Sequence, residues 1–155
     1  DLDPGPGAGL AECSELALAL RERLAADGLA ALPVTSGGKG MQLYVPLPSD
    51  GPMRLGMDAD AMSQFARSLA VSLSEMMPDL VVSRMTKSLR PGRVLLDWSQ
   101  NNGSKTTIAP YSLRGTPRSH VAAPVTWAEV EAGDLRQLTA ADVLARLAEF
   151  GDPLG

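Results

Sequence analysis

Three aspartates in this chain stand where carboxylates could bind metal ions. The chain opens Asp-Leu-Asp, and because alternate residues of a β-strand point to the same side, Asp1 and Asp3 would project together. Asp97 ends the apolar run Val-Leu-Leu, where burying a carboxylate requires a compensating charge or metal. Carboxylate oxygens suit hard divalent ions such as Mg²⁺ and Mn²⁺. The same spacing also fits two solvated loop aspartates and an Asp97 paired with Arg90 or Arg93.

The residues after the aspartate pair predict that the strand stops there. Pro4 and Pro6 have no N–H to continue the pairing, and Gly5 and Gly7 permit a sharp turn. We therefore expect a strand end that presents two carboxylates and then leaves the sheet.

A second polar group, Ser-Gly-Gly-Lys-Gly at 36–40, lies between two predicted strands. Its glycines could expose backbone N–H groups, Ser36 offers a hydroxyl and Lys39 a positive charge, a combination that suits phosphate. The spacing is not that of a Walker A motif, and a strand rather than a helix is predicted to follow. A glycine hairpin with an exposed lysine is the alternative.

The charge distribution also indicates a phosphate-bearing ligand. The net charge of −4 argues against a protein that coats nucleic acid non-specifically. However, seven of the 14 basic residues and one of the 18 acidic residues lie between Arg84 and Arg118. A basic segment in an acidic protein favours a phosphate partner, although a solvated charged loop would give the same pattern.

The elements that must position these groups follow from hydrophobic periodicity and capping signals. A single domain of mixed α+β class around a central sheet is expected, with no internal boundary. The predicted helices are 12–26, 58–77 and 139–150, and the last has a capping-box-like start at Thr139 and Asp142. The predicted strands are near 29–34, 41–47, 80–83 and 93–98. Residues 99–119 are expected to form mainly loop.

Several protein classes are excluded or disfavoured. No apolar run is long enough to span a membrane, and no secretory signal is visible. Cys13 is the single cysteine, which excludes an internal disulfide and a cysteine-rich zinc site and suits a reducing cytoplasm. We expect a cytoplasmic protein.

A resemblance to a known family is carried by four stretches: DLDPGPGA, TSGGKGMQLYVPL, MTKSLRPGRVLLDWSQNNGSKTTIAPYSLRG and AAPVTWAEV. Together they resemble the polymerase domain of bacterial DNA ligase D and its stand-alone relatives, in the archaeo-eukaryotic primase superfamily. The resemblance implies a mixed-sheet primase-polymerase fold with an RRM-like core. It also implies a nucleotidyltransferase that extends a primer 3′-hydroxyl in end joining and gap filling, associated with the bacterial nucleoid.

The resemblance further implies two bound Mn²⁺ or Mg²⁺ ions, nucleoside triphosphates, and DNA with a primer-template junction or broken ends. Ku and a ligase domain are implied as partners. The implied site residues are, for catalysis and metal binding, Asp1, Asp3 and Asp97; for nucleotide and phosphate, Ser36, Lys39, Gln42, Arg90, Gln100 and Arg114; and for the nucleic-acid backbone, Arg84 and Lys87.

Two features depart from the family pattern. Gln42 stands where the family usually has a histidine, and an amide can donate a hydrogen bond to phosphate but cannot carry a proton or a charge. Family members also have a long segment before the Asp-x-Asp motif, so we expect residues 1–155 to be the catalytic C-terminal portion of the domain. His120 is expected to lie in a loop and not to replace the histidine that the family usually has at position 42. The alternatives are a non-catalytic nucleotide- or nucleic-acid-binding module and a metal-dependent phosphohydrolase.

Overall fold

The computed structural model describes residues 1–50, 56, 58–115 and 117–154. Position 116, within the predicted 99–119 loop, lies outside the described residues. The helices are α1 (Leu10–Ala26), α2 (Ala59–Met76), α3 (Trp127–Ala132) and α4 (Ala140–Phe150), with two short 3₁₀ turns, η1 (Lys87–Leu89) and η2 (Trp98–Gln100). The strands are β1 (Leu2–Pro4), β2 (Leu32–Thr35), β3 (Met41–Tyr44), β4 (Val81–Val82), β5 (Val94–Leu96), β6 (His120–Val121), β7 (Ala123–Pro124) and β8 (Leu138–Thr139).

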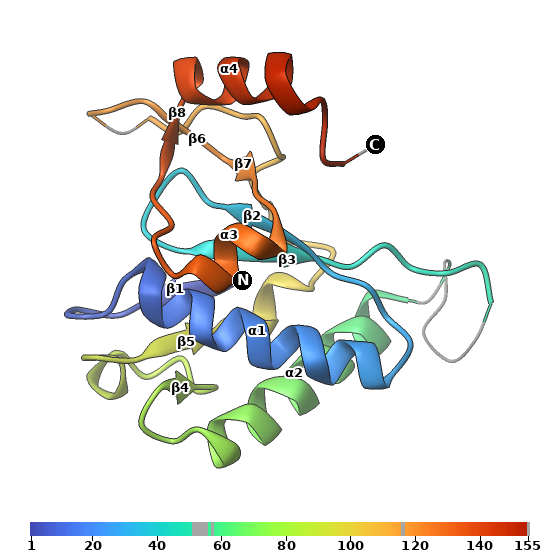
Figure 1. The fold of residues 1–155 in the computed structure, drawn as a ribbon. Coiled ribbons are helices and arrows are strands. Elements are labelled where there is room, and N and C mark those ends of the chain that lie inside the picture. Colours follow the sequence, from blue (N-terminus) through green and yellow to red (C-terminus); the bar gives the residue numbers. More distant parts are fainter. Residues whose placement is uncertain (51–55, 57, 116, 155) are drawn as a thin grey trace.

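A six-stranded sheet in the order β4-β5-β1-β3-β2-β7 forms the centre of the molecule (Figure 1). Its pairs are antiparallel except β4 with β5. Strand β1 lies between β5 and β3, with Leu2 opposite both Leu96 and Met41. The predicted mixed sheet flanked by helices is confirmed.

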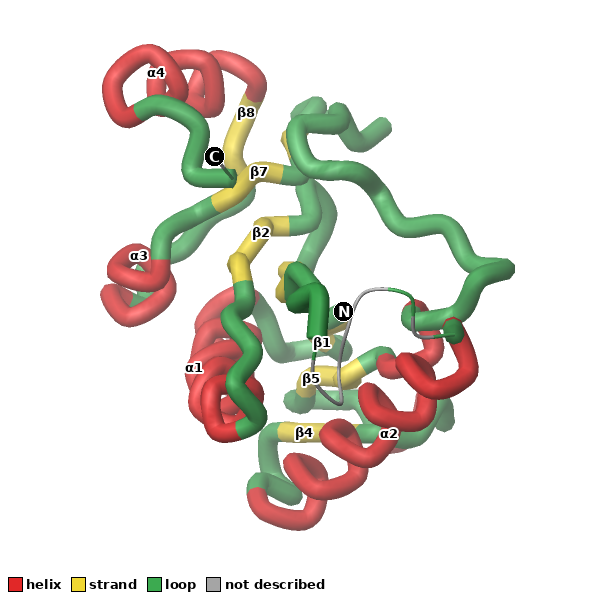
Figure 2. Tube along the Cα trace, turned by 90° about the vertical axis from the view of Figure 1, so that its right-hand side faces the viewer, coloured by secondary structure: helices red, strands yellow, loops and turns green. Residues whose placement is uncertain are grey.

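One face of the central strands is apolar and packs on helices. Leu2, Met41 and Leu96 belong to the same buried cluster as Cys13 and Leu16 of α1. Figure 2 shows α1 and α3 on one side of β1 and β2, and α2 near β4. Since neighbouring residues of a strand point to opposite faces, the residues beside Leu2 and Leu96 point away from α1.

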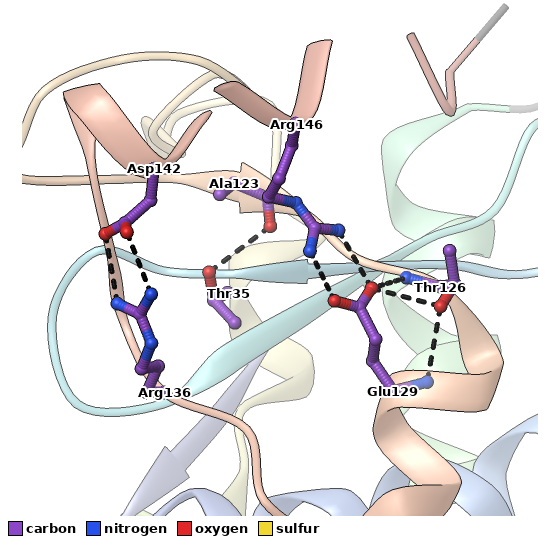
Figure 3. Close-up of polar contacts among 7 residues, drawn as sticks. All are labelled: Thr35, Ala123, Thr126, Glu129, Arg136, Asp142 and Arg146. Atoms are coloured by element: carbon purple, nitrogen blue, oxygen red, sulfur yellow. Dashed lines mark hydrogen bonds and ion pairs between the residues drawn. The ribbon is translucent and has the colours of Figure 1, made fainter. Parts of the chain in front are cut away.

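The C-terminal part adds a small second sheet of β6 and β8, which the sequence analysis did not predict. His120, expected in a loop, is in β6 opposite Thr139, so that prediction is wrong. A bidentate ion pair between Glu129 of α3 and Arg146 of α4 joins the two helices (Figure 3). The capping box predicted at Thr139 and Asp142 is confirmed.

Several predicted boundaries shift for identifiable reasons. Strand β3 ends at Tyr44 rather than at 47, because Pro46 has no N–H to donate to a neighbouring strand. Strand β5 ends at Leu96 rather than 98 because Asp97 caps the 3₁₀ turn η2. Helix α1 begins two residues earlier than predicted, at Leu10. Within the described ranges, no helix has both the length and the apolar character needed to cross a membrane.

Two glycines allow the backbones around β1 to approach closely. A Cβ added at Gly5 would lie 2.0 Å from the Arg90 carbonyl oxygen, and one at Gly40 would lie 2.0 Å from the Leu2 carbonyl oxygen. The Gly5 N–H also donates to the Arg93 carbonyl at 2.8 Å. The Pro-Gly turn after the aspartate pair therefore fixes the end of β1 against the segment leading into β5.

Gly40→Ala is predicted to destabilise the fold. Its Cβ would overlap the Leu2 carbonyl and lie 2.7 Å from Pro4 Cδ, so the β2–β3 turn would have to move. We expect the free energy of unfolding to fall by about 3 kcal/mol, measured by urea denaturation. Gly103→Ala is the control, because its nearest neighbour would be Ala59 Cβ at 3.7 Å. Equal effects of the two substitutions would contradict this account of β1.

The Glu129–Arg146 pair predicts an acid-sensitive C-terminal part. The Arg146 guanidinium lowers the pKa of Glu129 to about 2. Partial burial opposes this shift, and the hydrogen bonds from Thr126 add to it. A carboxyl with a lowered folded-state pKa stabilises above its unfolded pKa, and this contribution is lost as pH falls through about 4 toward 2. We expect the urea midpoint to drop between about pH 5 and about pH 3 in the wild type and less in Glu129→Gln. Glu149→Gln, at an exposed position, should behave as wild type.

Candidate active site

The three aspartates are brought to adjacent central strands. Asp1 and Asp3 flank Leu2 in β1, and Asp97 follows Leu96 in β5. The Asp97 N–H donates to the Asp1 carbonyl at 2.8 Å, which continues the β1–β5 ladder to these two residues. Because Leu2 and Leu96 face α1, all three carboxylates lie on the opposite side of the sheet.

Asp97 is held by the turn that follows it. Its Oδ1 accepts hydrogen bonds from both the backbone N–H and the hydroxyl of Ser99, and Lys105 Nζ donates to the same hydroxyl oxygen. The structure thus gives Asp97 a serine partner rather than Arg90 or Arg93. Among the described residues its Oδ2 accepts no hydrogen bond, so one carboxylate oxygen is available.

Asp3 is exposed and lies beside Arg90. Arg90 Nη1 donates to Asp3 Oδ2 at 3.4 Å, and Nη2 donates to the Met85 carbonyl at 2.9 Å. Arg90 Nε and Gln100 Oε1 are buried without a hydrogen-bond partner within the described part of the chain. Unpartnered buried polar atoms are costly, and both belong to residues predicted to line the nucleotide site.

The Ser36–Gly40 turn, between β2 and β3, is more enclosed than the sequence suggests. The Gly37 N–H donates to Gln137 Oε1, and the Gly38 N–H donates to Ser36 Oγ. These two amides are therefore already used within the protein. Lys39 is exposed, and the Ser36 hydroxyl, which accepts from Gly38, keeps its own proton to donate. The exposed Lys39 ammonium, rather than these amides, is available to a phosphate, whereas Ser36 is only 6% exposed.

Arg114 reaches the same turn from the long loop. Its Nε donates to the Ser36 carbonyl at 3.0 Å, and its side chain packs against Gly37, where an added Cβ would meet Cγ at 2.9 Å. Gly37 has φ +69°, a conformation that favours glycine. The predicted neighbours Ser36 and Arg114 are thus in contact although 78 positions separate them.

Gln42 is buried on the same side as Asp1. It lies in β3 one residue beyond Met41, which pairs with Leu2. Tyr44 Oη lies within hydrogen-bond distance of two acceptors, Gln42 Oε1 at 3.1 Å and the Ile108 carbonyl at 2.8 Å, so Tyr44 connects β3 to the long loop. Desolvation by partial burial raises the pKa of Tyr44, which keeps its hydroxyl protonated.

A cleft of about 320 Å³ adjoins Asp1 and Asp97. Asp1, Gln42, Asp97 and Gln100 contribute polar groups to it, and the remaining lining is mainly apolar, from α1, β3 and α2. A mainly apolar wall with a few polar groups is typical of small-molecule sites.

The donor set fits a hard divalent ion in its chemistry. Asp1, Asp3 and Asp97 supply carboxylate oxygens on one side of adjacent strands, and Asp97 has an uncommitted oxygen. The described residues contain no ready group of three acidic, histidine or cysteine side chains close enough to share one ion. The assignment of a metal site therefore stays a prediction. It requires the Asp3 carboxylate to release Arg90 and bind the ion instead.

Cys13 lies beneath this face and has no part in the chemistry. Its thiol is directed at the Leu2 carbonyl at 3.8 Å. Burial, with the nearby acids Asp3 and Glu12, raises the pKa of Cys13 to about 12, so the thiolate is not formed near neutral pH.

Comparison with known proteins identifies the family of this chain. The family model "LigD, primase-polymerase domain" matches residues 1–154. The chain belongs to the LigD primase-polymerase family. The family resemblance predicted from the sequence is confirmed.

Individual relatives of this family cover nearly the whole chain. The multifunctional non-homologous end joining DNA repair protein LigD of Mycobacterium tuberculosis is 53% identical over 99% of this chain, and the bifunctional LigD of Bacillus subtilis is 31% identical over the same share. The chain spans 20% and 24% of these relatives, respectively. The solved polymerase domain of Mycobacterium tuberculosis ligase D in complex with DNA superposes with a TM-score of 0.90 at 52% identity, over 99% of this chain and 51% of that one.

Four residues that contact the predicted site residues were not themselves predicted to belong to the site. They are Tyr44, Ser99, Lys105 and Gln137. Ser99 had a local signal, because an aspartate two residues before a serine is typical of a capped turn. Gln137 had none, because it lies 100 positions from its partner Gly37. Arg84 and Lys87, predicted to contact nucleic acid, are both exposed.

Proposed function

We propose that this chain carries the catalytic residues of a divalent-metal-dependent nucleotidyltransferase that adds nucleotides to a primer 3′-hydroxyl during bacterial end joining. The observation that carries the proposal is the presence of Asp1, Asp3 and Asp97 on one side of two adjacent central strands, next to the Ser36–Gly40 turn. Membership of the LigD primase-polymerase family supports this reading.

Asp1, Asp3 and Asp97 would hold the two Mn²⁺ or Mg²⁺ ions. When bound, such ions make a hydroxyl more acidic and neutralise charge on a triphosphate. Lys39 and Arg114 would add positive charge beside the phosphates, and the Ser36 hydroxyl would donate to a phosphate oxygen. The unpartnered Arg90 Nε and Gln100 Oε1 would find partners on the bound nucleotide.

DNA is the proposed second substrate. Arg84 and Lys87 are exposed, and Lys105, Arg114 and Arg118 lie farther along the same basic segment. Contacts from these side chains to backbone phosphates would make binding weaken as salt rises. The solved relative was determined in complex with DNA, which supports this partner. Ku and a ligase domain are proposed partners on family grounds alone.

Asp97→Asn is predicted to abolish nucleotide addition. Asparagine keeps an oxygen to accept from Ser99 but loses the negative charge, so the fold should persist. We expect primer extension with Mn²⁺ to fall at least about a hundredfold and Mn²⁺ binding to weaken. The assay uses the longest native polypeptide containing this chain, and Asp79→Asn, at an exposed position, is the control.

The same assay separates the alternatives. Nucleotide or DNA binding without extension would support a non-catalytic module, a reading that the glutamine at position 42 favours. Release of phosphate or pyrophosphate in the absence of a primer would support a phosphohydrolase. Extension that survives Asp97→Asn would contradict the assigned role of Asp97.

Gln42→His is predicted to improve use of the triphosphate. A histidine at this buried position restores the residue usual in the family and can carry a positive charge beside the phosphates. We expect KM for the nucleotide to fall by about threefold to tenfold, more at about pH 6 than at about pH 8. Steady-state primer extension at the two pH values measures the change. A KM that is unchanged at both would show that position 42 does not face the phosphates.

A further inference from the structure

The turn that carries Ser36 and Lys39 is held from outside by a second distant side chain besides Arg114. Gln137 Oε1 accepts from the Gly37 N–H at 2.8 Å, and Gln137 Nε2 donates to the Gly40 carbonyl at 2.9 Å. Within the turn, the Ser36 N–H donates to the same Gly40 carbonyl at 3.0 Å. The single amide therefore connects the beginning and the end of the turn.

The chemistry of this contact is specific to a primary amide. A side-chain amide offers a donor and an acceptor at one planar end, and these match the N–H of Gly37 and the C=O of Gly40. Glutamate would offer acceptors only, and leucine neither. Gln137 therefore recognises the backbone of the turn in its closed form.

Gln137 is itself anchored independently of the β2–β3 hairpin. It directly precedes β8, whose Leu138 and Thr139 pair with β6 and whose Thr139 forms the capping box of α4 with Asp142. The neighbouring Arg136 forms an exposed bidentate ion pair with Asp142 that does not contact the turn (Figure 3). The second sheet thus holds the amide while the turn is held against it.

We propose that Gln137 is a positioning residue for phosphate binding: it holds the turn so that the Ser36 hydroxyl and the Lys39 ammonium meet the triphosphate without prior ordering. The inference rests on the proposed function and deepens it, because it assigns the support of the phosphate site to the C-terminal sheet. Gln137 acts through the turn and does not itself contact the nucleotide. A turn that must be ordered on binding lowers affinity, so its loss should appear in KM more than in kcat.

The test compares Gln137→Leu, Gln137→Glu and Arg136→Ala in the longest native polypeptide containing this chain. Arg136→Ala is the matched control, since it removes the ion pair with Asp142 from the same segment without touching the turn. Four quantities are measured: KM and kcat for the nucleoside triphosphate in primer extension, the hydrogen-exchange rate of the Gly37 amide, and the thermal midpoint.

Gln137→Leu should raise KM about tenfold with kcat nearly unchanged, and should speed exchange at Gly37 by about tenfold or more. Gln137→Glu keeps the acceptor for the Gly37 N–H but loses the donor to the Gly40 carbonyl. KM should therefore rise, and hydrogen exchange at Gly37 should speed up less than in Gln137→Leu. Gln137→Glu also serves if the leucine variant does not fold. Arg136→Ala should lower the thermal midpoint while leaving KM and Gly37 exchange as in wild type.

Wild-type KM in Gln137→Leu, in a protein that extends primers, overturns the inference and leaves the proposed function standing. An equal rise of KM in Arg136→Ala also overturns it, because the effect would then be one of general stability. Wild-type protein that neither extends primers nor binds nucleotide instead refutes the proposed function, and the phosphate role of Gln137 with it.

Discussion

The structure depends on the close packing of β1 between β5 and β3. A three-residue strand in the middle of a six-stranded sheet has little side-chain area of its own, so its position is set by backbone contacts on both sides. Gly40 allows the β2–β3 turn to reach the Leu2 carbonyl, and Gly5 allows the turn after β1 to pass the Arg90 carbonyl. Main-chain contacts therefore bring together three segments that are distant in sequence. Hydrogen bonds between the strands, rather than contacts of flexible side chains, fix the relative positions of the groups that these segments carry.

This packing gives the central strands one apolar face and a second face that carries the aspartates. Leu2 and Leu96 face the helices, which makes their neighbours Asp1 and Asp97 face the other way. Like charges placed together on rigid strands oppose folding unless something compensates them. Arg90 beside Asp3, and Ser99 with Lys105 next to Asp97, supply part of this compensation from the polypeptide. A site that is only partly compensated in the free protein is one that gains from binding cations, which is the usual conflict between stability and function at an active site.

The sequence predicted those parts of the fold and site whose causes are local. Alternation and helical periodicity located α1, α2, α4 and the strands that flank the site, and the glycine-rich turn was correctly placed between β2 and β3. The two-residue strands β6, β7 and β8 were missed, because so short a strand has no periodicity and forms only through its partners. For the same reason His120 was wrongly assigned to a loop. Gln137 could not be predicted at all, since its two hydrogen bonds depend on how two sheets are placed relative to each other.

The missed elements connect the C-terminal part of the chain to the Ser36–Gly40 turn. The candidate metal ligands and the Ser36–Gly40 turn all lie at or before Asp97, and the first sheet positions them from one side. A glycine-rich turn is mobile by composition, since its residues pay a large entropy cost on ordering. Arg114 of the long loop donates to the Ser36 carbonyl, and Gln137 binds both ends of the turn, so residues within and after the long loop hold the turn from the second side. The turn that is proposed to bind phosphate is thus held from both sheets, and the short strands that no sequence pattern predicts carry part of this support.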